Sequence, residues 1–207
     1  ESIDPVRYIS NHSTGKMGIA LADAACEMGA EVQLVLGPVS LRPRNRSVRV
    51  INVTTARSMA DECISRFRGS DVAILAAAVA DYTPVDTPGK KLKRGPGDLV
   101  IRLKPTEDIA AILGRSKTDR QSVAGFSLET DNEIENAKDK LRRKNLDIIV
   151  LNSLKDKGSG FGHDTNRITI IDKNNNIDKF ELKTKEEAAG DILSKIVAMM
   201  NIQIQGL

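Results

Sequence analysis

Residues 4–18 gather several anion-binding side chains into one short segment of the chain. The segment contains an arginine, an asparagine, hydroxyl side chains, a lysine and two glycines, and an apolar pattern typical of a helix starts directly after it at Ile19. A helix start presents backbone N–H groups and the positive end of the helix dipole, and Lys16 adds a fixed positive charge. We therefore predict a phosphate or carboxylate site where this helix begins.

This segment matches neither of the two common phosphate-binding motifs. A Walker A loop requires a glycine five residues before the glycine of the Gly15-Lys16 pair, and position 10 is a serine. The pattern Gly-x-Gly-x-x-Gly is also missing from the segment. The segment thus predicts an anion site without indicating a familiar nucleotide-binding motif.

Two further clusters follow predicted strands. Residues 76–82 leave an apolar strand with small side chains that let a ligand approach the backbone, and Asp81 adds a carboxylate. Residues 125–130 leave the next strand with Phe126 and Glu129. Ligands of open α/β sheets bind beyond the carboxyl ends of the strands. Taken singly, small residues also serve helix packing, and an aromatic ring also serves the core.

Basic residues supply the third feature. Residues 90–94 form a basic run, and Lys140 and Lys144 are four residues apart on one face of a predicted helix. Taken singly, the basic run and the lysine pair are ordinary features of a solvated surface. Asn11 is likewise an ordinary residue for a turn. Combined with the anion site and the strand ends, they favour a phosphate-rich ligand whose charge is neutralised by lysines and by a metal shared with an acidic group.

The order of predicted elements indicates how these groups are positioned. Helices are predicted over 15–29, 56–68, 106–114, 132–144 and 185–199, and strands over 31–36, 48–53, 71–78, 99–103, 122–126, 147–151, 167–171 and 179–182. The alternation predicts an α/β fold with a doubly wound, mostly parallel sheet. The continuously apolar run 71–78 predicts a strand buried on both faces. Residues from about 84 to 104 are predicted to form a mobile basic flap, and the last two strands a hairpin before the final helix.

Composition narrows the class of protein. The 207 residues suit a single domain, and 31 basic residues interspersed with 28 acidic ones disfavour nucleic-acid binding. Cys26 and Cys63 fall on apolar helix faces, which predicts buried thiols rather than a disulfide or a metal site. With no signal-peptide pattern and no apolar run near 18 residues, we expect a soluble cytoplasmic protein without a membrane partner.

Six motifs distributed along the chain resemble one known family. They are Asp4–Gly18, Gly37-Pro38, Ala77–Tyr82, Lys91-Leu-Lys93, Gly125-Phe126 with Glu129-Thr130, and Lys144-Asn145-Leu-Asp147. In this order they resemble bacterial phosphopantothenoylcysteine synthetase. The resemblance implies a Rossmann-like homodimer, the ligase half of a bifunctional flavoprotein whose decarboxylase half lies upstream. It also implies that CTP activates 4′-phosphopantothenate to an acyl-cytidylate with release of pyrophosphate, and that L-cysteine then displaces CMP.

The resemblance further implies roles for individual residues. Asn11 and Lys91 would be catalytic, Asn11 donating to the carbonyl oxygen under attack and Lys91 closing over the triphosphate. The substrate would contact Arg7, Asn11 and Ala78, with Arg7 reaching across the dimer interface. Mg²⁺ would bridge the phosphates, with Asp81 as its protein ligand. The implied nucleotide contacts are Leu75, Ala76, Ala77, Asp81, Lys91, Glu107, Asp108, Ile109, Ala110, Phe126, Lys140 and Lys144.

One departure and two alternatives accompany this interpretation. The family begins with a strand and a Thr-Ala-Gly-x-Thr-x-Glu loop, whereas this sequence starts at the glutamate of that pattern, so we expect the first strand to be missing from the domain formed by residues 1–207. An NAD(P)-dependent oxidoreductase of Rossmann type would require a glycine-rich loop and Tyr-x-x-x-Lys. Tyr8 and Tyr82 are followed four residues later by His12 and Asp86. The presence of the two implied catalytic residues argues against a non-catalytic nucleotide-binding module.

Overall fold

The protein is described by a computed structural model that covers residues 1–129, 131–153 and 163–205. Thr130, which belongs to one of the motifs above, lies outside these described residues. The helices are α1 (Lys16–Glu27), α2 (Ala56–Phe67), α3 (Ile109–Ser116), α4 (Glu133–Arg143) and α5 (Lys185–Gln205). The strands are β1 (Gln33–Leu36), β2 (Arg49–Asn52), β3 (Val72–Leu75), β4 (Tyr82–Pro84), β5 (Leu103–Pro105), β6 (Ser122–Glu129), β7 (Ile148–Ser153), β8 (Thr165–Asn166), β9 (Ile168–Asp172), β10 (Ile177–Lys179) and β11 (Lys183–Thr184).

The central sheet has five strands in the order β10-β9-β7-β6-β3. β3, β6 and β7 are parallel, whereas β9 pairs antiparallel with both β7 and β10. β1 and β2 form a separate parallel pair. The predicted α/β fold with a mostly parallel sheet is therefore confirmed, with an antiparallel hairpin at one edge.

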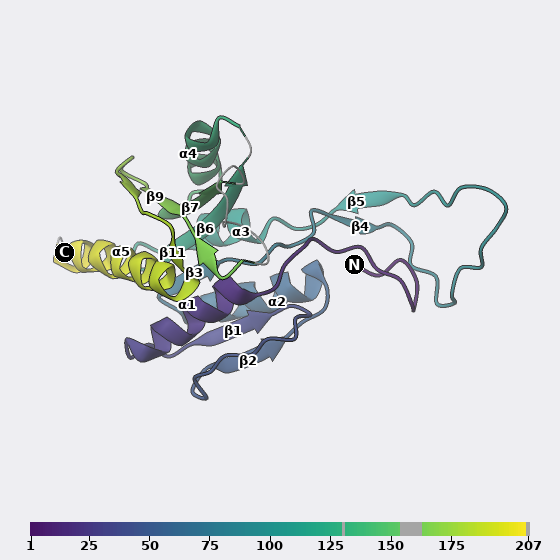
Figure 1. The fold of residues 1–207 in the computed structure, drawn as a ribbon, viewed down its shortest axis with the longest axis horizontal. Helices are drawn as coiled ribbons and strands as arrows, with labels where there is room; N and C mark the ends of the chain where they lie inside the picture. The colour runs from purple at the N-terminus through teal and green to yellow at the C-terminus, as the bar shows by residue number, and fades with distance from the viewer. Residues whose placement is uncertain (130, 154–162, 206–207) are drawn as a thin grey trace.

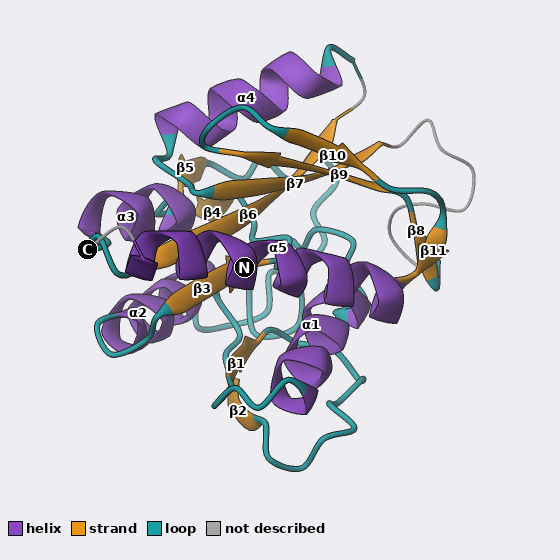
Figure 2. Cartoon of the chain, turned by 90° about the vertical axis from the view of Figure 1, so that its left-hand side faces the viewer, coloured by secondary structure: helices purple, strands orange, loops and turns teal. Residues whose placement is uncertain are grey.

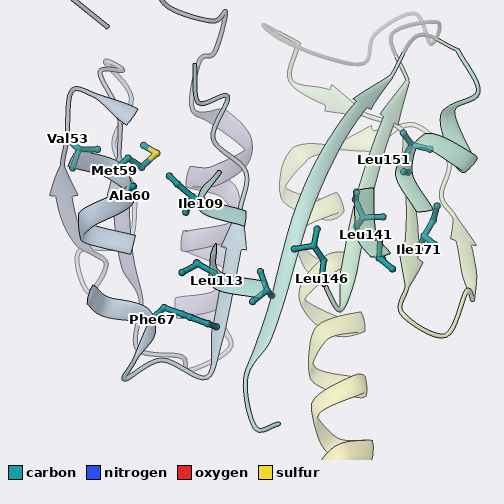
Figure 3. Close-up of a cluster of buried hydrophobic side chains, with 13 residues drawn as sticks. Val53, Met59, Ala60, Phe67, Ile109, Leu113, Leu141, Leu146, Leu151 and Ile171 are labelled. Carbon is teal, nitrogen blue, oxygen red and sulfur yellow. The ribbon is translucent and has the colours of Figure 1, made fainter. Parts of the chain in front are cut away.

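Helices cover both faces of this sheet, as Figure 2 shows. Successive side chains of β7 alternate between two cores: Ile149 and Leu151 join the core with α2, α3 and α4, while Ile148 and Val150 join the core with α1 and α5. Figure 3 shows part of the first core. All four of these β7 side chains are at most 4% exposed, so β7 is the strand buried on both faces.

Local capping explains where two of the helices begin. Thr55 caps α2 in a reciprocal capping box with Ser58. Thr184 and Glu187 make the same exchange at the start of α5, since each backbone N–H donates to the other side chain at 2.8 and 3.2 Å. The predicted starts of these two helices, at residues 56 and 185, are confirmed.

Three predicted strands differ from the structure. The run 71–78 forms a strand only over β3, and it is half-buried because β3 lies at the edge of the five-stranded sheet. The strand predicted over 99–103 is instead β5, because the opposing segment supplies partners only from Tyr82 to Val85. The strand predicted over 179–182 is instead β10, because the Asp172 carboxylate accepts the N–H groups of Asn174 and Asn176 and closes the turn early.

Two segments extend together from the body of the protein, as Figure 1 shows. One is the N-terminal arm, residues 1–9, and the other is the flap, residues 84–104, which continues the β4–β5 pair. Tyr8 is 73% exposed on the arm and Val100 is 84% exposed on the flap, while Tyr82, at the start of β4 beside the flap, is 54% exposed. Large apolar side chains thus gather on the extension. Within the part of the chain that the structure describes, no helix is long and apolar enough to cross a membrane.

Candidate functional site

The start of α1 and the loop after β3 lie against each other. The Asn11 side-chain amide donates a hydrogen bond to the Val79 carbonyl at 3.0 Å. A Cβ on Gly18 would lie 3.9 Å from that of Ala76. Ala77, the next residue, is exposed, and Ala78 is half-buried. The structure thus brings Asn11 to the carboxyl end of β3, as the sequence predicted for a ligand site.

Gly15 allows the sharp entry into α1. Its φ of 74° lies in the left-handed region, and a Cβ there would approach Val39 Cγ2 to 3.0 Å. α1 begins without a side-chain cap, and Lys16 pairs with Asp164 at 2.5 Å. The start of α1 therefore presents its backbone beside β3. The charge of Lys16 is already neutralised there by the exposed carboxylate of Asp164.

Thr106 connects the loop after β3 to α3. Its backbone N–H donates to the Asp81 carbonyl at 2.9 Å, and its hydroxyl donates to the Ala80 carbonyl at 2.6 Å. These bonds place Glu107 and Asp108 beside Asp81. From the sequence, Thr106 was predicted only as the first residue of a helix. Its position two residues before the capping residue Asp108 could have indicated that its hydroxyl contacts the preceding loop.

Asp108 joins α3 to the end of α4. It caps α3 by accepting the Ala111 N–H at 3.1 Å, and it also accepts from the Lys144 ammonium at 2.9 Å. Burial by itself raises the pKa of Asp108, but the bonds from Lys144 and Ala111 outweigh it and lower that pKa below its ordinary value. Asp108 is thus ionised and holds Lys144 in place.

A close backbone approach makes this pairing possible. A Cβ on Gly114 of α3 would lie 1.9 Å from the Lys144 carbonyl oxygen, so only glycine fits there. The Asn145 amide donates to the Gly114 carbonyl at 2.7 Å, and Asn145 has a φ of 51°. α3 and the end of α4 are therefore held in contact at the backbone.

Lys140 lies one helical turn before Lys144. Its ammonium donates to the Phe126 carbonyl at 2.8 Å. Burial lowers the pKa of Lys140, and Lys144 lowers it further, while Glu129, Asp108 and Asp81 act in the opposite direction. Phe126 thus offers its backbone to this site, while its ring packs against the core with α1 and α5.

These groups border an open surface pocket of about 910 Å³. The pocket combines four basic with three acidic side chains and one amide. It is lined by Asp81, Glu129, Asn136, Asp139, Lys140, Arg142, Arg143 and Lys144. The site predicted from the sequence did not include Asn136, Asp139, Arg142 and Arg143. The basic residues in the last turn of α4 could have indicated two of them. The pocket suits a ligand with several phosphates.

Arg7 on the N-terminal arm contacts Leu92, the residue after Lys91 on the flap. The Arg7 guanidinium pairs with Asp4 and donates to the Leu92 carbonyl at 2.9 Å. The Lys91 side chain is exposed on the flap. The structure therefore joins two of the predicted site segments, the N-terminal arm and the flap.

The remaining predicted residues are placed mainly by packing. Ile109 is buried, and Leu75 and Ala110 pack against the same core. Glu107 is half-exposed and lies 4.0 Å from Arg57. A ligand at this edge of the sheet would meet the backbone of these core residues rather than their side chains. The thiol of Cys63 also packs in this core, where burial raises its pKa to about 11, and both cysteines are free.

The described residues contain no group of three or more His, Cys, Asp or Glu side chains able to hold a metal by themselves. Mg²⁺ commonly binds one or two carboxylates together with substrate phosphates and water. Asp81 is exposed at the rim of the pocket and fits that arrangement.

Comparison with known proteins identifies the family. Residues 1–200 match the family described as "DNA/pantothenate metabolism flavoprotein C-terminal domain". The chain is 65% identical over 201 residues to "Cysteine/Cysteine sulfinic acid decarboxylase" from an unknown prokaryotic organism, covering 97% of this chain and 56% of the relative. It is 42% identical over 199 residues to "Coenzyme A biosynthesis bifunctional protein CoaBC" of Bacillus subtilis (strain 168), covering 96% and 49%. The chain thus spans about half the length of the curated relatives it matches.

A solved structure agrees with this match. "Crystal structure of the C-terminal Domain of Coenzyme A biosynthesis bifunctional protein CoaBC" superposes with a TM-score of 0.82 at 38% identity, covering 97% of this chain and 90% of that one. These matches do not favour the oxidoreductase alternative. Since fold, motifs and sequence match agree over nearly the whole chain, the chain belongs to the family of DNA/pantothenate metabolism flavoprotein C-terminal domains.

Proposed function

We propose that this chain is the ligase domain that joins 4′-phosphopantothenate to L-cysteine, with CTP as the activating nucleotide. The observation that carries the proposal is the position of Asn11 against the loop after β3, whose far end at Asp81 borders the cationic pocket of Lys140 and Lys144. The loop after β3 thus contacts an amide donor for an acyl group at Val79 and borders cations for phosphates at Asp81. The relatives named for coenzyme A biosynthesis support the same reaction.

In the first step, a carboxylate oxygen of 4′-phosphopantothenate attacks the α-phosphorus of CTP. A P–O bond forms to give the acyl-cytidylate, and the bond to the leaving pyrophosphate breaks. Lys140 and Lys144 offset the negative charge on the nucleotide, and Lys91 reaches the triphosphate from the flap. Asp81 would hold Mg²⁺ together with the phosphates, and the ion would supply further charge neutralisation.

In the second step, the cysteine amine attacks the acyl carbon. The C–N bond forms, the amine loses a proton, and CMP leaves as the C–O bond breaks. The Asn11 Nδ2 group has two N–H bonds. The Val79 carbonyl accepts one of them, which leaves the other for the oxygen that gains charge. One such donor is typically worth about 3–4 kcal/mol of transition-state stabilisation.

The exposed apolar residues of the extension support a homodimer. Tyr8, Tyr82 and Val100 are exposed on the arm, on β4 and on the flap, a surface that a second copy of the chain would cover. The half-length match to bifunctional relatives supports a flavin-dependent decarboxylase domain upstream in the native protein, and a cytoplasmic location suits this metabolism.

The test is a nucleotide-dependence assay. The protein is mixed with 4′-phosphopantothenate, cysteine, Mg²⁺ and each nucleoside triphosphate in turn, and pyrophosphate is followed. Pyrophosphate that depends on CTP and not on ATP supports the proposal. No pyrophosphate with any triphosphate, or release that does not require 4′-phosphopantothenate, would overturn it.

A further inference from the structure

The flap is tied to the N-terminal arm at two points. The Thr87 hydroxyl donates to the Ser2 carbonyl at 3.2 Å. Farther along the flap, both backbone groups of Leu92 are held by the arm, the N–H by Asp4 at 3.1 Å and the carbonyl by Arg7 at 2.9 Å. Side chains of the arm therefore bond Leu92 much as a neighbouring strand would.

Asp4 is the centre of this arrangement. It is 2% exposed, and local contacts with the arm and flap cover it. Its carboxylate accepts the backbone N–H groups of Val6 at 2.8 Å and Arg7 at 2.9 Å, and the Arg7 Nε–H at 3.0 Å. The Arg7 guanidinium holds the pKa of this carboxyl well below its usual range. Asp4 is thus ionised at neutral pH, and its bonds to the arm and to the flap are charge-assisted.

We propose that Asp4 and Arg7 are positioning residues that hold the flap backbone at Leu92 and thereby place Lys91 over the nucleotide. The Leu92 N–H belongs to the peptide group that links Lys91 to Leu92. Fixing that N–H fixes the plane of this peptide, which includes the Cα of Lys91, and so anchors the point from which the Lys91 side chain extends. This role for Lys91 rests on the function proposed above.

The arrangement also assigns Arg7 a task inside its own chain. With one branch on Asp4 and another contact to the Leu92 carbonyl, the guanidinium spans the arm and the flap. A planar, forked cation suits such bridging better than the single charge of lysine. Arg7 would therefore act on the reaction through the flap rather than by holding the substrate.

The experiment measures tryptic cleavage of the flap after Lys93 and Arg94 in the full chain. Asp4→Asn is compared with wild type and with Asp98→Asn, which removes an exposed carboxylate from the same flap. Loss of the charge-assisted bond to Leu92 should increase the cleavage rate roughly tenfold, because cleavage follows the population of the opened flap. Asp98→Asn should leave the rate unchanged.

A second variant guards against a general folding defect of the arm. Leu92→Pro removes the flap donor and leaves Asp4 and Arg7 intact. It should raise cleavage by a similar factor, with the melting temperature of the body unchanged. Equal cleavage of wild type, Asp4→Asn and Leu92→Pro would overturn the proposal, as would an equal rise in Asp98→Asn.

Kinetics separate positioning from substrate binding. If the pair acts through the flap, Asp4→Asn and Arg7→Ala both lower kcat roughly tenfold and leave the KM for 4′-phosphopantothenate unchanged. If Arg7 holds the substrate instead, Arg7→Ala raises that KM while flap cleavage stays at the wild-type rate, and the proposal is overturned. Cleavage rates do not depend on turnover, so a failure of the proposed ligase activity is distinguishable from a failure of this inference.

Discussion

Asp147 offers the sharpest test of how the fold supports the pocket. It lies directly before β7 and is 2% exposed. Its carboxylate accepts the Lys117 ammonium at 2.6 Å, the Val123 N–H at 2.9 Å and the Lys173 ammonium at 3.0 Å. Replacing it by asparagine keeps the shape and one acceptor oxygen but removes the charge that pairs with both lysines.

The expected loss of unfolding free energy depends on how exposed the two lysine partners of Asp147 are. Breaking a buried pair by removing one charge costs about 3–5 kcal/mol of unfolding free energy. The Lys173 side chain is 38% exposed and contributes little, while that of Lys117 is 13% exposed and reaches some water. We therefore expect Asp147→Asn to cost about 3 kcal/mol, or roughly 6–12 °C in melting temperature for a chain of this size.

The assay is urea unfolding followed by circular dichroism, with Asp139→Asn as the matched control. Asp139 pairs with Arg142 on the exposed face of α4, where both side chains are about two-thirds exposed. Such a surface pair is worth only a few tenths of a kcal/mol, so this control should leave stability almost unchanged.

The difference in stability between wild type and Asp147→Asn should also depend on pH. Burial raises the pKa of Asp147, but the bonds from Lys117, Val123 and Lys173 outweigh it and lower that pKa below its ordinary value. The folded state then binds fewer protons than the unfolded state, so the stabilisation is complete above the ordinary carboxyl pKa and is lost as pH falls through the folded value. The gap in unfolding free energy between wild type and Asp147→Asn should shrink as the pH falls from 6 to 3. A gap below 0.5 kcal/mol at pH 7, or one that does not change with pH, would refute this reasoning.

Three further predictions concern the site itself. Lys140→Gln should raise the KM for CTP roughly tenfold in the pyrophosphate assay, because it removes a half-buried cation from the pocket. The control Lys138→Gln, on the same helix, should leave that KM unchanged. Equal effects of the two variants would contradict a phosphate contact. Gly114→Ala should lower the unfolding free energy by about 2 kcal/mol or more, since its Cβ would overlap a backbone carbonyl, while Gly69→Ala, with open space around it, should have little effect in the same urea titration. Asn11→Asp should still release pyrophosphate but stall before amide formation, measured as accumulation of the acyl-cytidylate by mass spectrometry; product at the wild-type rate would show that the amide donor is not needed.

Local signals in the sequence predicted most of the secondary structure correctly. The starts of α2 and α5 were predicted correctly because a helix start depends on residues within one turn, such as the capping residues Thr55 and Thr184. The Asn-rich turn after Asp172 predicted a hairpin, although its carboxylate closes the turn sooner than periodicity indicated. The apolar run after Asp71 was misjudged, because whether a strand is central or at an edge depends on partners elsewhere in the chain.

Local sequence patterns were enough to predict the five helices, the strands of the central sheet and the motifs that reveal the family. Those features depend on residues within a few positions of one another. The pairing of distant groups, such as Asn11 with Val79, Asp108 with Lys144, and Asp4 with Leu92, became visible in the folded chain alone. Contacts of that kind depend on the path of the whole chain, because the packing that holds two segments together is formed by residues belonging to neither.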